Sequence, residues 1–139
     1  MPSYAGDVTS LEAWEALQAD DRALLVDVRT AAEWTFVGIC DLSRLGRQPV
    51  LISWQSFPGM AVNENFAADL AAAGVEKATT LYFLCRSGAR SRAAAMAATS
   101  AGYTKCYNVS DGFEGDADEA RHRSQVNGWK YSGLPWVQN

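Results

Sequence analysis

The run TTLYFLCRSGARSRAAAMAATSAG, residues 79–102, combines the patterns of a strand, a short loop and a helix. Its first part is apolar, β-branched and aromatic and ends on Cys85, which predicts a buried strand. A short polar loop containing Gly88 follows, and the alanine-rich remainder predicts a helix over about 91–101. In an open α/β sheet, a loop between a strand and the next helix lies at the carboxyl edge, where ligand crevices form. We therefore expect Cys85 to lie in a binding crevice.

The sequence around Cys85 is typical of an activated cysteine. Arg86, Arg90 and Arg92 follow within seven residues, and the first backbone N–H groups of the next helix have no partner inside the helix. Positive side chains and a helix N-terminus both favour the thiolate, which is the nucleophilic form of cysteine. We predict that Cys85 is a nucleophile and that Arg86 and Arg90 contact an anion.

The run CRSGARS, residues 85–91, resembles the active-site loop of single-domain rhodaneses, which are sulfurtransferases that carry sulfur as a cysteine persulfide. Other segments are similar to this family in order and spacing, so that the resemblance covers nearly the whole chain. They are LLVDVR at 24–29 with EW at 33–34, GY at 102–103, YNV at 107–109, GFEG at 112–115, GW at 128–129 and GLPW at 133–136.

The resemblance implies a rhodanese-like α/β fold with a central, mainly parallel five-stranded sheet and helices on both faces. The alternation of strand and helix patterns also predicts a parallel sheet covered on both faces. The implied activity moves sulfane sulfur from a small anionic donor such as thiosulfate to cyanide, a thiol or a protein acceptor through a Cys85 persulfide. The implied substrate-binding loop consists of Arg86, Ser87, Gly88, Ala89, Arg90 and Ser91. No metal and no organic cofactor are expected, because the cysteine itself stores the sulfur.

Two other functions remain open. Phosphatases and arsenate reductases also place a cysteine and an arginine in an anion loop, but those that share the rhodanese fold resemble C-x5-R. Here Cys85 and Arg90 have C-x4-R spacing, and the shorter loop suits a single sulfur atom better than a tetrahedral phosphate. A non-enzymatic rhodanese module for protein binding is the other alternative, although inactive relatives typically lose the cysteine.

Several polar and sulfur-containing side chains outside the loop have simpler interpretations. Asp27 and Arg29 are expected to form a buried or half-buried polar pair that supports the loop from a neighbouring strand end. Cys40 and Cys106 are expected to pack in the interior, as unpaired cysteines commonly do. His122 is the single histidine, and without paired Cys/His spacing we expect a surface position for it and no metal site.

Composition sets the class of protein. The chain has 139 residues, of which 48% are hydrophobic and 20% charged, as expected for one globular domain covering residues 1–139. A net charge of −4 and the absence of a basic face argue against nucleic-acid binding. No apolar run approaches the roughly 18 residues of a membrane span, so no membrane partner is expected. Three widely spaced cysteines and no signal-like N-terminus predict a cytoplasmic location.

The remaining elements follow from local patterns. TSLE at 9–12 and TAAE at 30–33 are capping boxes, which predict helices to about residues 17 and 36. Strands are expected over 4–8, 23–28, 49–54 and 105–109, a helix over 63–73, a turn over 57–59 and a short helix with loops over 116–125. Residues 37–48 are poorly patterned and depart from the family. Trp34, Trp54 or Phe57 are candidates for the wall of the substrate entrance.

Overall fold

The architecture is an α/β sandwich built on a parallel sheet. The computed structural model describes residues 4–56, 59 and 61–138. Its central sheet has five strands in the order β1-β8-β7-β2-β4, and every neighbouring pair is parallel. The strands are β1 (Gly6–Val8), β2 (Leu24–Asp27), β4 (Val50–Leu51), β7 (Thr80–Leu84) and β8 (Lys105–Val109). The expected fold class is therefore confirmed.

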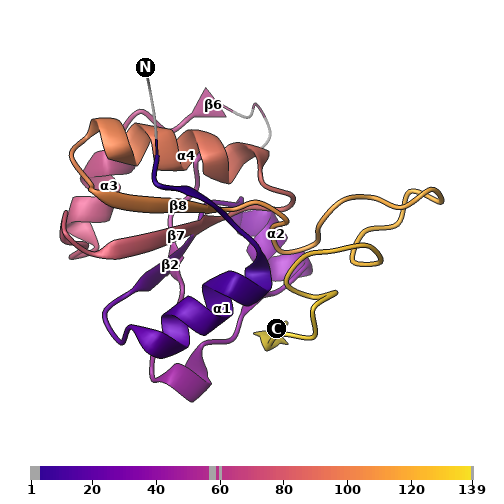
Figure 1. Cartoon of the computed structure of the whole chain (residues 1–139). Coiled ribbons are helices and arrows are strands. Elements are labelled where there is room, and N and C mark those ends of the chain that lie inside the picture. The colour runs from indigo at the N-terminus through magenta and orange to yellow at the C-terminus, as the bar shows by residue number, and fades with distance from the viewer. Residues whose placement is uncertain (1–3, 57–58, 60, 139) are drawn as a thin grey trace.

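Helices cover both faces of the sheet (Figure 1). Helix α1 (Ser10–Ala19) lies on one face, and α3 (Phe66–Ala72) and α4 (Ala89–Ser100) lie on the other. Each interface has its own hydrophobic core, because the central strands are buried on both sides. The α3–α4 core contains Phe66, Leu70, Phe83, Ala94 and Ala98, and the α1 core contains Ala13, Leu17, Leu25, Leu84 and Trp129.

Both predicted capping boxes are present. The Thr9 and Thr30 side chains each accept a hydrogen bond from the backbone N–H three residues later, and Glu12 and Glu33 accept from the backbone of the two capping threonines. The second box starts the short helix α2 (Ala31–Phe36), which follows β2 at the carboxyl edge of the sheet. This helix carries Glu33 toward the loop that contains Cys85.

Several boundaries differ from the expectation. The strand expected over 49–54 is limited to Val50–Leu51, the helix expected over 63–73 runs over Phe66–Ala72, and α4 begins at Ala89 instead of about residue 91. The expected turn over 57–59 falls mostly on residues 57 and 58, which lie outside the described residues. A short hairpin of β5 (Gln55–Ser56) and β6 (Ala61–Val62) flanks it.

The expectation of a short helix over 116–125 was wrong. These residues form turns, and Arg121 and Ser124 have positive φ values that a right-handed helix does not allow. The Asp118 carboxylate accepts from the backbone N–H groups of Ala120 and His122, both at 2.8–2.9 Å. This local pairing competes with helical hydrogen bonds and explains the irregular path.

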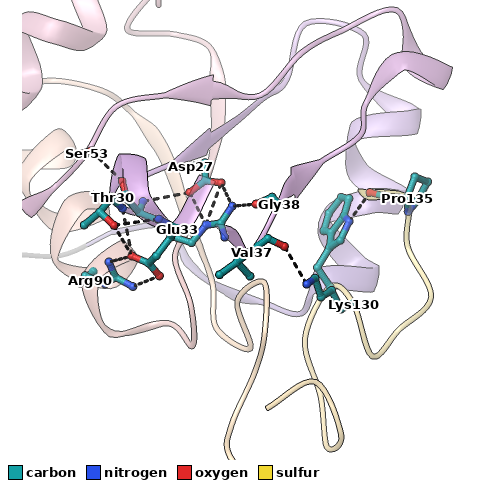
Figure 2. A network of polar contacts seen from close by, with 11 residues as sticks. Asp27, Thr30, Glu33, Val37, Gly38, Ser53, Arg90, Lys130 and Pro135 are labelled. Atoms are coloured by element: carbon teal, nitrogen blue, oxygen red, sulfur yellow. Dashed lines mark hydrogen bonds and ion pairs between the residues drawn. The ribbon is translucent and has the colours of Figure 1, made fainter. Parts of the chain in front are cut away.

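The C-terminal segment returns to the body of the protein. Strand β9 (Trp136–Val137) pairs with β3 (Ile39–Cys40), and a 3₁₀ turn follows at Ser43–Leu45. The buried Trp129 donates from Nε1 to the Pro135 carbonyl at 2.7 Å, and Lys130 Nζ donates to the Val37 carbonyl at 2.9 Å (Figure 2). The first residues of the poorly patterned stretch 37–48 are thus held by a distant part of the chain.

None of the helices in the described part of the chain combines the length and apolarity needed to cross a membrane.

Candidate active site

A pocket of about 360 Å³ opens at the carboxyl end of β7. Cys85 is the first residue after this strand, and 1% of its surface is accessible, so it forms the floor of the pocket. The lining residues come from the loop, from α2 and from the β5 hairpin. They are Glu33, Gln55, Cys85, Arg86, Ser87, Ala89 and Arg90.

Two polar groups contact the sulfur of Cys85. The backbone N–H of Gly88 donates to Sγ at 3.1 Å, and Ser91 Oγ lies 3.2 Å from Sγ. Gly88 is the N-cap residue of α4 and has φ +110° and ψ −17°, a conformation that favours glycine. The sulfur therefore lies at the N-terminus of a 12-residue helix, where the helix dipole stabilises negative charge.

The segment after β8 supports the loop from behind. The Phe113 N–H donates to the Cys85 carbonyl at 2.8 Å, and the Glu114 and Gly115 N–H groups both donate to the Arg86 carbonyl at 3.0 Å. Gly112 packs so tightly here that a Cβ would overlap the backbone of Arg86. The loop is consequently fixed by backbone contacts on the side away from the pocket.

Arg90 faces a carboxylate of the protein itself (Figure 2). Its two terminal nitrogens donate to the two Glu33 oxygens at 2.6 and 3.0 Å. Burial opposes the charge of Glu33, but the hydrogen bonds from Arg90 and Thr30 outweigh it and hold the pKa of Glu33 below its ordinary value of 4.5. Glu33 also raises the pKa of Arg90, against the effect of burial. Much of the charge of Arg90 is therefore neutralised before any substrate arrives.

The other two arginines of the loop region occupy different surroundings. Arg86 is exposed, lines the pocket and forms no ion pair with any residue that the structure describes. Arg92 is exposed as well, but its guanidinium lies 5.9 Å from the Tyr4 ring and outside the pocket lining. The cation best placed to meet an anion in the pocket is therefore Arg86.

Asp27 and Arg29 form a fully buried ion pair. The shortest contact, from Arg29 Nη2 to Asp27 Oδ2, is 2.6 Å, and both side chains are 0% accessible. Arg29 also donates to the Gly38 carbonyl at 2.8 Å, and its guanidinium carbon lies 4.3 Å from the centre of the Phe113 ring. Phe113 in turn contacts the Cys85 carbonyl. The pair reaches the loop through Phe113.

The remaining sequence candidates are distributed as follows. Cys40 and Cys106 are buried free thiols, and burial raises the pKa of both. Trp34 and Trp54 do not line the pocket, and Phe57 lies outside the described residues. Gln55 supplies part of the wall instead.

Sequence reasoning missed two residues close to Cys85. The sequence indicated that Glu33 belongs to a helix cap, and the structure confirms this. No local sequence pattern, however, indicated that the same carboxylate binds Arg90. Asn108 is a 3% accessible polar side chain inside β8 that accepts from Ser91 Oγ at 2.5 Å. A polar residue in an otherwise buried strand was the available signal, since buried polar groups need partners.

Sequence comparison finds relatives that match most of this chain. A family model described as the STR4 middle domain matches residues 5–139. The uncharacterized protein RC0915 of Rickettsia conorii is 40% identical over 131 residues, which are 94% of this chain and 95% of that protein. The rhodanese-like domain-containing protein 4 of Arabidopsis thaliana, a chloroplast protein, is 28% identical over 99% of this chain and 27% of its own length.

Solved structures agree with these sequence matches. The crystal structure of Rv0390 from M. tuberculosis has a TM-score of 0.90 and 51% identity, covering 99% of this chain and 100% of that one. The polysulfide-sulfur transferase homodimer from Wolinella succinogenes has a TM-score of 0.64 and 20% identity, covering 96% and 78%. At that identity the second match shows a shared fold.

Proposed function

Because this chain belongs to the rhodanese-like family, we propose that it is a sulfurtransferase in which Cys85 carries sulfur as a persulfide. One observation carries the proposal. The Cys85 sulfur forms the floor of a pocket at a helix N-terminus, 3.1 Å from the Gly88 N–H. This arrangement stabilises a sulfur anion and leaves one side open to a substrate.

The chemistry proceeds in two displacements. The Cys85 thiolate attacks the outer sulfur of a donor such as thiosulfate, the S–S bond of the donor breaks, and sulfite leaves with the bonding electron pair. The resulting persulfide anion is held near the Gly88 N–H. An acceptor nucleophile, which is cyanide, a thiol or a protein thiolate, then attacks the outer sulfur and releases the Cys85 thiolate. Oxidation states balance without a metal or an organic cofactor.

The charged residues of the pocket have separate roles in this proposal. Arg86, which pairs with no carboxylate among the described residues, lines the pocket and is the residue that attracts an anionic donor. Arg90 is paired with Glu33, so its main role is to fix the wall of the pocket, and its contribution to donor binding is reduced. This division favours a donor with little negative charge over one that needs two arginines.

Intact-mass measurement tests the reaction class. Purified protein incubated with thiosulfate should gain one sulfur atom and lose it again on addition of cyanide, with thiocyanate as the product. Cys85→Ser should gain nothing, whereas Cys40→Ser and Cys106→Ser should behave as wild type. A folded wild-type protein that takes up no sulfur from thiosulfate, from polysulfide or from a low-molecular-weight persulfide would contradict the proposal. Hydrolysis of an aryl phosphate through Cys85 would favour the phosphatase alternative instead.

A further inference from the structure

The carboxylate of Glu33 is fixed at the wall of the Cys85 pocket. Its Oε1 accepts from the Thr30 backbone N–H and hydroxyl, both at 3.2 Å, and from Arg90 Nη1 at 2.6 Å, while Oε2 accepts from Arg90 Nη2 at 3.0 Å (Figure 2). The Glu33 and Arg90 side chains are only 19% and 18% accessible. Two parallel hydrogen bonds of this kind fix the geometry of both partners. Both terminal nitrogens of Arg90 are therefore committed to α2.

The charged side chains that line the pocket leave one positive charge unmatched. They are Glu33, Arg86 and Arg90, and Arg86 has no carboxylate partner among the residues that the structure describes. Cys85 is one of the groups that raise the pKa of Arg90, after Glu33, so the Arg90 guanidinium lies within electrostatic range of the sulfur. Without Glu33, two cations would face a substrate in the pocket, and with Glu33 only Arg86 does.

The size of the pocket suits an organic ligand. Its volume of about 360 Å³ lies within the range of about 300–1,000 Å³ that is typical of sites for small organic molecules. Gln55 and Ser87 add an amide and a hydroxyl to the lining, and both can form hydrogen bonds with an uncharged polar group. The site therefore combines room for an organic group with a single unpaired cation.

We propose that Glu33 is a specificity-determining residue that holds Arg90 away from the donor, so that the site takes organic persulfides with one negative charge in preference to thiosulfate, which is a dianion. This inference rests on the proposed function. A single carboxylate on the organic group of such a donor pairs with Arg86, and the sulfur that Cys85 attacks carries no charge. Thiosulfate instead brings two negative charges next to the reacting sulfur and needs both arginines.

The transfer is the first displacement with a thiolate as leaving group. The Cys85 thiolate attacks the outer sulfur of R–S–SH, the S–S bond of the donor breaks, and RS⁻ leaves with the bonding electron pair. The transferred sulfur then loses its proton to solvent, which leaves the Cys85 persulfide anion, and RS⁻ takes up a proton from solvent. No oxidant or reductant is consumed.

Glu33→Gln removes the charge and keeps the helix cap. Glutamine suits this position of a capping box, because its amide oxygen still accepts from Thr30. A neutral amide binds Arg90 less strongly than a carboxylate does, so the guanidinium becomes available to a dianion. Intact mass gives the second-order rate constant for sulfur uptake. This constant should rise about tenfold or more with thiosulfate and change less than about threefold with N-acetylcysteine persulfide.

Two further variants make the test specific. Glu12→Gln is the matched control, because Glu12 has the same place in the capping box of α1 and does not line the pocket. It should keep the wild-type ratio of the two rate constants. In Arg90→Met protein, Glu33→Gln should raise the thiosulfate rate less than about twofold, since no guanidinium remains to be released.

Three outcomes would overturn the proposal. They are a wild-type protein that takes sulfur faster from thiosulfate than from N-acetylcysteine persulfide, an equal change for both donors in Glu33→Gln, and an equal gain with thiosulfate whether or not Arg90 is present. Sulfur uptake from neither donor in wild type would count against the proposed function itself.

Sulfate gives a readout that needs no sulfur transfer, because it is a dianion without a sulfur atom to donate. At constant ionic strength, the sulfate concentration that halves the rate of Cys85 alkylation by iodoacetamide should fall about tenfold in Glu33→Gln and stay unchanged in Glu12→Gln. Unchanged protection in folded Glu33→Gln protein would refute the role of Glu33. This measurement judges Glu33 independently of whether the protein is a sulfurtransferase.

Discussion

The two ends of α4 offer a matched pair of glycine substitutions. Gly88 precedes the helix with φ +110°, and Gly102 follows it with φ +103°. An alanine at either position must adopt a backbone conformation that costs about 1–3 kcal/mol. The surroundings differ, however. At Gly88 a new methyl group would overlap the Ser110 carbonyl oxygen and lie 3.0 Å from its carbon, whereas at Gly102 it would lie 3.4 Å from the flexible Lys77 side chain.

These contacts determine how much each substitution should lower the free energy of unfolding. Gly102→Ala should lower the free energy of unfolding by about 1–3 kcal/mol, which is the backbone term alone. Gly88→Ala adds overpacking against rigid backbone, about 1–3 kcal/mol more, for a total of about 2–6 kcal/mol. The Gly88 N–H would also shift relative to Cys85 Sγ, so persulfide formation should slow in Gly88→Ala and keep its wild-type rate in Gly102→Ala.

Urea unfolding and intact-mass kinetics of both variants check this expectation. The m-values should match wild type, so that differences in midpoint report stability. Equal destabilisation by the two substitutions, with equal rates of sulfur uptake, would show that the loop can move away from Ser110. Gly88 would then not lie in a fixed cradle.

Three further predictions concern the same site. Cys85→Ser should abolish persulfide formation with little change in Tm, because a serine hydroxyl is not ionised at neutral pH; a thermal melt beside the mass measurement checks both. Since Arg90 lowers the pKa of Glu33, the stability that this pair contributes is present above about pH 4.5 and is lost as the pH falls through the pKa of folded Glu33. Wild type should therefore lose more stability than Glu33→Gln between about pH 6 and pH 3 in urea titrations, and parallel losses would show that the pair contributes nothing. Arg29→Met leaves Asp27 buried and unpaired and should cost about 3–5 kcal/mol, with partial recovery in the double variant Asp27→Asn/Arg29→Met; a cost below about 1 kcal/mol would mean that water or another cation reaches Asp27.

Local features of the fold could be predicted from the sequence because their partners lie three residues apart. Thr9 with Glu12 and Thr30 with Glu33 form capping boxes from adjacent sequence alone, and the apolar run before Cys85 needs only its own composition to indicate a buried strand. The position of Cys85 at the carboxyl edge then follows from general sheet topology.

Contacts between distant residues could not be predicted in the same way. Glu33 and Arg90 are 57 positions apart, and Ser91 and Asn108 are 17 apart, so neither pair has a signature in local spacing. Residues 37–41 lacked a pattern because they are held by residues 130–137, nearly one hundred positions later. The turns over 116–125 depend on one side chain, that of Asp118, competing for backbone N–H groups.

The backbone support behind the Cys85 loop also constrains how the protein is made. The loop carbonyls are bound by residues 113–115, and residues 37–40 are held by residues 130–137. During synthesis, Cys85 and α4 leave the ribosomal exit tunnel before these supporting residues do, because they come earlier in the chain. The nascent chain therefore carries a cysteine whose cradle is still incomplete. Reactivity toward sulfur compounds should arise only after residues 113–115 and 130–137 have left the exit tunnel and docked onto the body of the protein.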